Sequence, residues 1–201
     1  MASEILSEER TSMAKLAELE QRRPRRADAR RNYDALIETA RVAFAELGPQ
    51  APLEEIARRA GVGIATLYRN FTTREELVEA VYLEEVEAVC RFADDVVDFD
   101  PWPALIAWLD RLVDYLGTKR ALIDALNRDS PALQACRQSM FDAGEPLLGR
   151  AQDSGVVRPD VAIDDVMRLV SAITGVKFSD DSQRDKLLAV ALDGLRNTPR
   201  A

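Results

Sequence analysis

The stretch that decides the fold is Leu53–Phe71, which reads LEEIARRAGVGIATLYRNF. Apolar residues recur at helical spacing on both sides of a tight glycine turn, so the pattern predicts two short helices. Gly61 stands where the first helix must end in a left-handed conformation, which a Cβ would penalise. Ala57 is small enough for the two helices to cross closely. The segment is typical of a helix-turn-helix, whose second helix enters the major groove of DNA.

The second helix of this pattern, expected over residues 64–71, ends in polar side chains. Hydroxyl and guanidinium groups suit phosphate oxygens, while Arg and Asn also match guanine and adenine edges. Taken alone, each aromatic or apolar residue in the helix could instead belong to the core. We favour core packing for Leu67 and Phe71, and DNA contact for the adjacent residues Tyr68, Arg69 and Asn70.

Charge is distributed unevenly along the chain. The formal net charge is −8, but the acidic excess lies after residue 74. The segment 21–31 instead holds Asp28 among a cluster of arginines, namely Arg22, Arg23, Arg25, Arg26, Arg30 and Arg31. A basic arm that leads into a helix-turn-helix is an electrostatic footprint of DNA binding. A solvated tail is the alternative, and the position of the arm favours phosphate or minor-groove contact by Arg25, Arg26 and Arg30.

The chain contains no histidine. This excludes Ser-His-Asp and Cys-His catalysis and the usual zinc sites. Cys90 and Cys136 are far apart and have no metal-type spacing. The acidic residues Asp94, Asp95, Asp98 and Asp100 match no Ca²⁺ loop. Carboxylate- or lysine-based chemistry remains open, but no motif points to it, so we expect no catalytic residues, no metal and no cofactor, and a protein that is not an enzyme.

The sequence also lacks the patterns of membrane insertion and secretion. No stretch approaches about 18 uninterrupted apolar residues. The first residues, MASEILSEER, do not combine a basic start with an apolar core, as a secretion signal does. We therefore expect a cytoplasmic protein that has no membrane partner.

Helical patterns fill most of the chain. Apolar residues recur at helical spacing over residues 33–47, where Gly48-Pro49 ends the pattern. Thr73 and Glu76 form a capping box that opens a long helix. Further helices are expected to start at Pro101, Ser130-Pro131, Asp160 and Ser182. No segment shows sustained strand alternation, so the sequence predicts an all-α fold.

The segment 51–81, APLEEIARRAGVGIATLYRNFTTREELVEAV, resembles the N-terminal domain of the tetracycline-repressor (TetR) family of bacterial transcriptional regulators. The resemblance covers about residues 30–90, and the phrase LLGRAQDSGVVRPDV is similar to the C-terminal domain of one subgroup. It implies about nine helices, with a three-helix DNA-binding domain, a linking fourth helix and a larger ligand-binding and dimerisation domain. We accordingly expect an N-terminal extension with the basic arm over 1–26, a helix-turn-helix domain over 27–74, and the ligand-binding and dimerisation domain over 75–201.

The resemblance also implies roles for single residues of the DNA-binding domain. Tyr68 is similar to a phosphate-contacting tyrosine, and Arg74 stands where a lysine commonly contacts the DNA backbone. Ala51 replaces the usual Thr or Ser, which removes a cap, and Asn70 stands where His is common. We expect positioning on DNA by Tyr68, Asn70 and Arg74, and sequence reading by Ile64, Ala65, Thr66 and Arg69.

The C-terminal half is expected to make the protein a homodimer. One helix-turn-helix reads only a few base pairs, so specific binding requires two about one DNA turn apart, and hence a palindromic operator. Two apolar stripes could pair in a four-helix interface or form intramolecular core. The resemblance favours the dimer interface, with Val166, Val170, Ile173, Leu187, Leu188, Ala191 and Leu195.

Large apolar side chains concentrate in the middle helices. For any one of them the sequence favours core packing, but the resemblance implies a pocket for a small-molecule effector. The expected lining residues are Trp102, Trp108, Leu112, Tyr115, Met140, Phe141 and Met167. A ligand that prefers one conformation would move the recognition helices out of register with the DNA grooves.

The sequence therefore predicts a DNA-binding transcriptional regulator, a repressor that a small molecule releases from its operator. The alternatives are an enzyme or small-molecule carrier built on a helical bundle, and a protein-interaction module that does not bind an operator.

Overall fold

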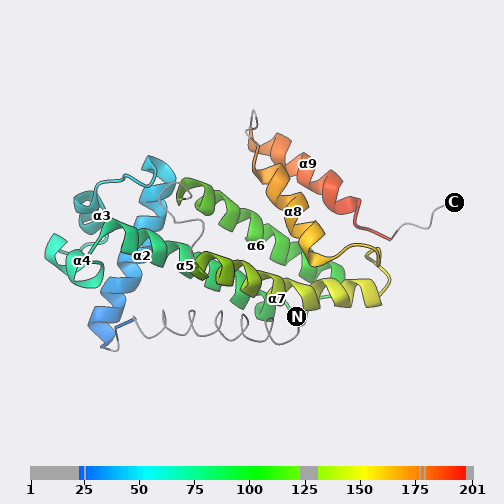
Figure 1. The fold of residues 1–201 in the computed structure, drawn as a ribbon, viewed down its shortest axis with the longest axis horizontal. Coiled ribbons are helices and arrows are strands. Elements are labelled where there is room, and N and C mark those ends of the chain that lie inside the picture. The colour runs from blue at the N-terminus through cyan, green and yellow to red at the C-terminus, as the bar shows by residue number, and fades with distance from the viewer. Residues whose placement is uncertain (1–22, 25, 123–130, 177, 179, 198–201) are drawn as a thin grey trace. The chain divides into compact units, whose positions relative to one another are not determined.

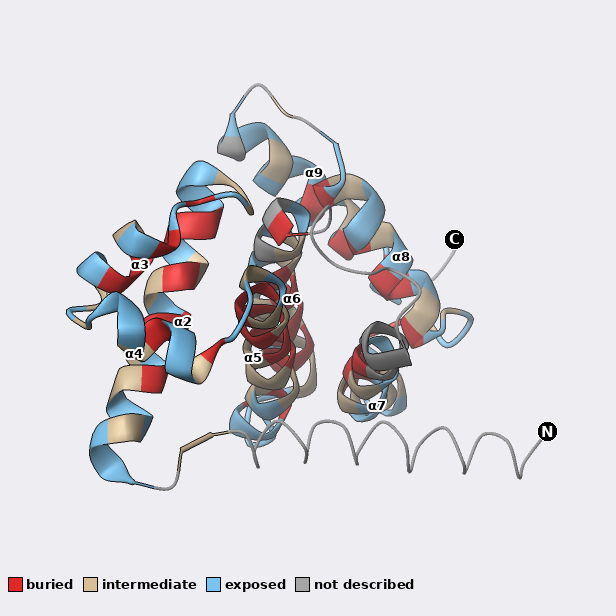
Figure 2. Cartoon of the chain, turned by 60° about the vertical axis from the view of Figure 1, so that its left-hand side comes forward, coloured by how far each residue is buried: buried red, intermediate tan, exposed pale blue. Residues whose placement is uncertain are grey.

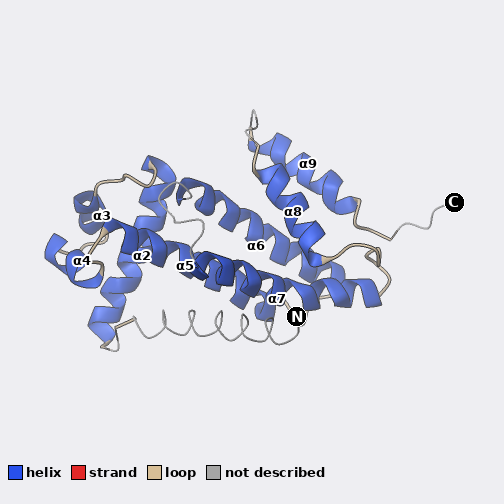
Figure 3. Cartoon of the chain, in the orientation of Figure 1, coloured by secondary structure: helices blue, strands red, loops and turns tan. Residues whose placement is uncertain are grey.

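The computed structural model describes residues 23–24, 26–122, 131–176, 178 and 180–197, and its secondary structure is helical (Figures 1 and 3). The described helices are α2 (Ala27–Leu47), α3 (Leu53–Arg59), α4 (Ile64–Asn70), α5 (Arg74–Asp95), α6 (Pro101–Leu122), α7 (Pro131–Asp153), α8 (Ile163–Thr174) and α9 (Asp181–Asp193). Over these ranges no β-strand occurs, and one isolated antiparallel bridge joins Val157 to Arg196. The predicted all-α fold is confirmed. Most of the N-terminal extension, Arg22 and Arg25 included, lies outside the described residues.

Several helix ends lie where the sequence predicts them. α2 ends before Gly48, whose N–H donates to the Phe44 carbonyl oxygen at 2.9 Å. α5 opens with the predicted cap, since Thr73 Oγ1 accepts from the Glu76 N–H at 3.2 Å. The Glu76 carboxylate accepts in return from the N–H of Thr72, one residue earlier than in the standard box, at 2.7 Å. α6 and α7 begin at the predicted prolines, Pro101 and Pro131.

The last two helices start at residues that differ slightly from the prediction. A helix was expected to begin at Asp160, but α8 begins at Ile163, because the capping carboxylate comes from Asp165 inside the first turn. This carboxylate accepts from the Ala162 N–H at 3.0 Å. α9 begins at Asp181, since Asp180 caps it by accepting from the N–H of Gln183 at 2.9 Å.

The chain divides into two compact units. The first comprises Met1–Glu87 and Gly117–Gln138, and the second comprises Ala88–Leu116 and Ser139–Ala201. The division falls within α5, after Glu87, whereas the domain boundary expected from the sequence lies after residue 74. The boundary expected after residue 74 divides the DNA-binding part from the ligand-binding part, and it stays a prediction.

The core of the first unit is a buried stripe along α2 with apolar residues of α3 and α4 (Figure 2). Leu36, Phe44 and Ile56 are completely buried. The Tyr33 and Phe71 rings meet with their centroids 5.1 Å apart. Leu67 and Phe71 are buried, which confirms that they belong to the core. This packing fixes α3 and α4 on α2.

The second unit is packed around Trp108 of α6. The Trp108 side chain is completely buried, and its indole N–H donates to the Val89 carbonyl oxygen at 3.1 Å. A Cβ added to Gly144 of α7 would lie 2.4 Å from Trp108 Cη2 and 2.9 Å from Ile163 Cδ1. Only glycine therefore allows α7 to approach Trp108 so closely. None of the described helices is long and apolar enough to cross a membrane.

Candidate nucleic-acid interface

The turn between α3 and α4 has the geometry that the sequence predicts. Gly61 adopts a φ of 70°, in the left-handed region, and its N–H donates to the Arg58 carbonyl oxygen at 3.2 Å. The Val62 N–H donates to the Ala57 carbonyl oxygen at 3.0 Å. Gly63 is the N-cap residue of α4. These contacts fix the angle at which α4 leaves the turn.

One face of α4 is open to solvent. Ile64 and Tyr68 are 37% and 48% exposed, and Ala65 and Arg69 are also exposed. These residues lie at i, i+1, i+4 and i+5, so they share a face opposite the buried Leu67. Thr66 and Asn70 are half-buried at the edge of this face. We call the solvent-open set Ile64, Ala65, Tyr68 and Arg69 the α4 face.

The side chains of Thr66, Arg69 and Asn70 take part in hydrogen bonds within α4. Arg69 Nε donates to the Ala65 carbonyl oxygen at 3.1 Å, and Arg69 Nη2 donates to Thr66 Oγ1 at 3.0 Å. The Asn70 amide donates to the Thr66 carbonyl oxygen at 2.8 Å. Thr66 thus holds the guanidinium group of Arg69 along the helix. A base or phosphate that recruits Arg69 exchanges these hydrogen bonds for its own.

Arg74 ties the start of α5 to the loop that leads into α3. Its Nη1 donates to the carbonyl oxygens of Ala51 at 2.5 Å and Pro49 at 3.2 Å. This contact was not predicted from the sequence. A signal was present, because an arginine side chain offers several donors in a fixed fork and can bond to two carbonyl groups at once. The predicted contact of Arg74 with the DNA backbone stays a prediction.

The basic arm is described in part. Arg23 forms a bidentate ion pair with Glu84 of α5, with Nε at 2.9 Å from Oε1. This hydrogen bonding raises the pKa of Arg23. Arg31 pairs with Asp28 on the exposed surface of α2. Of the predicted DNA-contacting arginines, Arg26 and Arg30 are exposed, and Arg25 is outside the described residues.

The basic residues of α3 belong to a network of surface ion pairs. Glu55 accepts from Arg58 Nη2 at 2.7 Å and from Arg59 Nε at 2.8 Å, and these hydrogen bonds lower the pKa of Glu55 to about 2. Arg59 Nη1 also lies 2.6 Å from the Glu46 carboxylate of α2. The network links α3 to α2 and pairs the basic side chains in the last turn of α3 with carboxylates.

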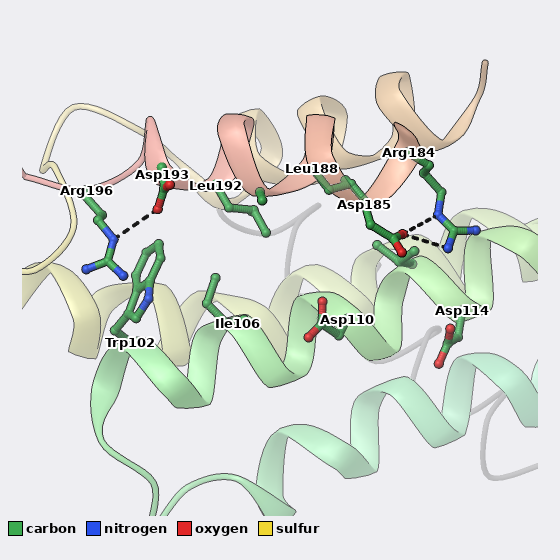
Figure 4. A pocket seen from close by; sticks show the side chains of 12 residues that line it. Trp102, Ile106, Asp110, Asp114, Arg184, Asp185, Leu188, Leu192, Asp193 and Arg196 are labelled. Atoms are coloured by element: carbon green, nitrogen blue, oxygen red, sulfur yellow. Dashed lines mark hydrogen bonds and ion pairs between the residues drawn. The ribbon is translucent and has the colours of Figure 1, made fainter. Parts of the chain in front are cut away.

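In the second unit, a groove of about 480 Å³ lies between α6 and α9 (Figure 4). We call it the α6–α9 groove. It is lined by Trp102, Ile106, Asp110, Val113, Asp114, Arg184, Asp185, Leu188, Ala189, Leu192, Asp193 and Arg196. Of the residues predicted to line an effector pocket, only Trp102 lies here. Trp108, Leu112, Tyr115, Met140 and Met167 are buried and Phe141 is half-buried, so their role in a pocket stays a prediction.

The predicted dimer stripes lie mostly in the interior of the second unit. Val166, Val170, Leu188 and Leu195 are buried, and Ile173 and Ala191 are half-buried. Leu187 is 43% exposed, and two more apolar residues that were not predicted from the sequence are exposed as well, Val190 at 63% and Val176 at 55%. The role of the predicted residues in a dimer stays a prediction. The large exposed apolar residues of α9 are Leu187 and Val190.

No metal site is present over the described ranges, where no group of three or more Cys, Asp or Glu side chains could hold an ion. The polar groups on and beside the α4 face are hydroxyl, guanidinium and amide groups, which can form hydrogen bonds with a binding partner.

Comparison with known proteins places both halves of the chain in one group. Residues 36–81 match the family model "Bacterial regulatory proteins, tetR family", and residues 100–197 match "Transcriptional regulator SbtR-like, C-terminal domain". The match to the C-terminal model confirms the likeness to a subgroup.

Two solved structures are similar over most of their length. A TetR transcriptional regulator from Streptomyces coelicolor is 37% identical, with a TM-score of 0.74, over 82% of this chain and 98% of that chain. A TetR transcription regulatory protein from Mycobacterium vanbaalenii is 32% identical, with a TM-score of 0.70, over 86% of this chain and 99% of that chain. The transposon Tn10 TetC protein of Escherichia coli is 28% identical over 86 residues, a segment that spans only 44% of that protein.

Proposed function

The chain belongs to the TetR family of bacterial transcriptional regulators and is a DNA-binding regulator, and we propose that it is a homodimeric repressor released from a palindromic operator by a small molecule. The observation that carries the DNA-binding part of this proposal is the α4 face. A solvent-open helix face with Tyr68 and Arg69 follows a fixed turn, as in a recognition helix that enters the major groove.

The roles on DNA divide between positioning and reading. Tyr68 contacts a phosphate through its hydroxyl, with Asn70 beside it, and Arg26 and Arg30 add phosphate contacts from α2 and its start. Ile64, Ala65, Thr66 and Arg69 face the base edges, where arginine suits guanine and an alkyl group suits the thymine methyl. Arg74 acts on the DNA chiefly through the loop that it holds, by fixing the entry into α3.

A dimer is required because a single recognition helix reads too few base pairs for a specific site. Two copies related by twofold symmetry would read the two halves of a palindrome. The exposed apolar residues Leu187 and Val190 on α9 supply a surface for this pairing, and the predicted Ala191 is adjacent to Val190 in the sequence.

Release from DNA follows from differential binding. A ligand that prefers the conformation with a poor fit to DNA lowers the population that binds the operator. About 3 kcal/mol of differential affinity weakens DNA binding roughly a hundredfold. The relatives are regulators rather than enzymes, so the ligand would act by binding and not as a substrate.

The test is fluorescence anisotropy with duplex DNA from the promoter of the protein's own gene. We expect tight binding to a palindromic segment, with log K falling steeply as log salt rises. A flat salt response, or equal affinity for a scrambled duplex, would contradict operator binding. Light scattering that gives only monomer at micromolar concentration would contradict the dimer. Increased transcription from this promoter in the presence of the protein would contradict repression.

A further inference from the structure

The α6–α9 groove has the size and wall chemistry of a ligand site. Its volume of about 480 Å³ lies within the range of small-molecule pockets. Ile106 of α6 and Leu188 and Leu192 of α9 give its middle an apolar lining (Figure 4). All of its lining residues belong to the second compact unit. The groove thus offers an elongated apolar middle with polar groups at its two ends.

The charges of the lining residues indicate the sign of charge that a ligand of this groove should carry. The groove holds Asp110, Asp114, Asp185 and Asp193 but only Arg184 and Arg196. Both arginines are engaged with groove carboxylates. Arg184 donates to Asp185 from Nε at 2.9 Å and from Nη2 at 2.8 Å, and Arg196 Nε lies 3.3 Å from Asp193. The excess charge is therefore negative.

Asp110 and Asp114 carry this excess. They lie one helical turn apart on α6, at the same end of the groove as Asp185 (Figure 4). Neither carboxylate has an ion-pair partner among the residues that the structure describes. Partial loss of hydration raises the pKa of Asp110, and the nearby Asp114 and Asp185 raise it further. A bound cation would relieve both effects.

The other end of the groove already accommodates a cation. The Arg196 guanidinium lies over the Trp102 ring, with 4.4 Å from Cζ to the ring centroid. The backbone of Arg196 is held in place by its bridge to Val157 and by the hydrogen bond from the Arg158 N–H to the Leu195 carbonyl oxygen at 2.9 Å. A delocalised cation of the chain itself thus stacks on the Trp102 ring at this end of the groove.

We propose that the α6–α9 groove binds an amphiphilic organic cation, whose ammonium or guanidinium group lies between Asp110 and Asp114. Its apolar part lies on Ile106, Leu188 and Leu192 and points toward Trp102. A neutral or anionic ligand of the same shape leaves the two carboxylates unpaired and binds more weakly. Only the regulatory consequence, that this ligand is the effector, rests on the proposed function.

Binding is tested by calorimetry on the full chain with three probes of equal chain length. The probes are octylguanidinium, its neutral isostere octylurea and the anionic octanoate, all below the concentrations at which they form micelles. We expect octylguanidinium to bind at least about tenfold more tightly than octylurea, and octanoate to bind most weakly. Equal affinities for octylguanidinium and octylurea would overturn the proposal.

The double variant Asp110→Asn/Asp114→Asn locates the site. It removes both charges without changing the groove's shape, and it should lower octylguanidinium affinity at least about tenfold while leaving octylurea unchanged. The matched control is Asp98→Asn, an exposed carboxylate outside the groove. Unchanged octylguanidinium affinity in the double variant, or an equal loss in the control, would overturn the proposal. Thermal melts of each variant report whether it is folded.

The regulatory consequence has a separate readout. Anisotropy with the operator is measured with and without saturating octylguanidinium. Weaker operator binding in the wild type, but not in the double variant, supports the effector role of the groove. Unaltered operator binding by the loaded protein would overturn that role alone. Failure of the free protein to bind any operator would count against the proposed function, while the calorimetric result still decides the groove.

Discussion

The Arg74 guanidinium donates to the Ala51 carbonyl oxygen at 2.5 Å, and it thereby joins the first turn of α5 to the loop before α3. The bond closes a contact between residues that are 23 positions apart in the sequence. Because this loop sets where α3 begins, Arg74 can influence DNA binding without touching DNA.

Replacing Arg74 separates a role in the loop from a role on phosphate. In Arg74→Gln, the carbonyl groups of Ala51 and Pro49 lose a charged donor, so we expect a loss of unfolding free energy of about 1–3 kcal/mol. We expect operator affinity to fall while the slope of log K against log salt changes by much less than one. Chemical denaturation and anisotropy measure the two effects. An unchanged stability with a slope reduced by about one would identify a phosphate contact instead.

Tyr68 and Arg69 should affect DNA binding in different ways. In the proposed function Arg69 reads a base edge, so Arg69→Ala should cost about 1–3 kcal/mol of operator affinity and relax specificity at one position of each half-site. The Tyr68 hydroxyl is proposed to contact a phosphate, so Tyr68→Phe should weaken binding evenly across sequences. A panel of single base-pair changes in the operator measures both. The assignment fails if Arg69→Ala lowers affinity equally for every operator in the panel.

Gly144 and Gly149 of α7 make a matched pair. A Cβ at Gly144 meets the Trp108 ring, so Gly144→Ala should destabilise the protein by about 1–3 kcal/mol through overpacking. A Cβ at Gly149 meets no atom within 4 Å, and alanine favours the helix, so Gly149→Ala should stabilise the protein by up to about 1 kcal/mol. Urea denaturation gives both values. A Gly144→Ala variant at least as stable as the wild type would show that Trp108 does not restrict Gly144.

Asp110 should reduce stability at neutral pH. Its folded-state pKa is raised above the ordinary 3.8, so the folded protein loses the proton less readily than the unfolded chain. The unfolding free energy of the wild type therefore falls as pH rises from 3.8 through the raised pKa. Above the raised pKa the loss of unfolding free energy is complete and stays constant. Asp110→Asn, which stays neutral, should raise the melting temperature near pH 7 by no more than about 2 °C, because the carboxylate is exposed.

The acid side of the same experiment is the check. Below the ordinary pKa both states of the wild type carry the proton, so the difference between Asp110→Asn and the wild type should vanish there. Asp98→Asn is the matched control and should change the melting temperature at neither pH. A difference that grows on acidification would contradict the raised pKa of Asp110.

The helix-turn-helix could be predicted from the sequence because its determinants are local. Gly61, Ala57 and Leu67 lie within eleven positions, and each is required by the geometry of one turn. The α6–α9 groove could not be predicted, since it depends on the register between two helices about eighty residues apart. Trp102 and Trp108 show the difficulty, because they lie on one apolar helix and only tertiary packing decides that one lines a groove and the other is buried.

Arg74 illustrates a second limit. Sequence patterns record which residue could contact DNA, but not which loop carbonyl groups lack a donor in the folded chain. From the sequence, Ala51 matters only because its side chain cannot cap the following helix. In the structure, its backbone carbonyl oxygen accepts a hydrogen bond from Arg74. Such contacts follow from the path of the backbone and not from side-chain spacing.

Because Arg23 is paired with Glu84, any contact that Arg23 made with a DNA phosphate would be an exchange of one partner for another. The Glu84 carboxylate presents two oxygens to the guanidinium, as a phosphate would, so it is an internal rival for Arg23. A phosphate that recruits Arg23 must first displace Glu84, and the operator gains only the difference between the two bonds. In Glu84→Gln, a phosphate that recruits Arg23 would no longer displace a carboxylate, so the variant would bind every DNA sequence more tightly and discriminate less between them.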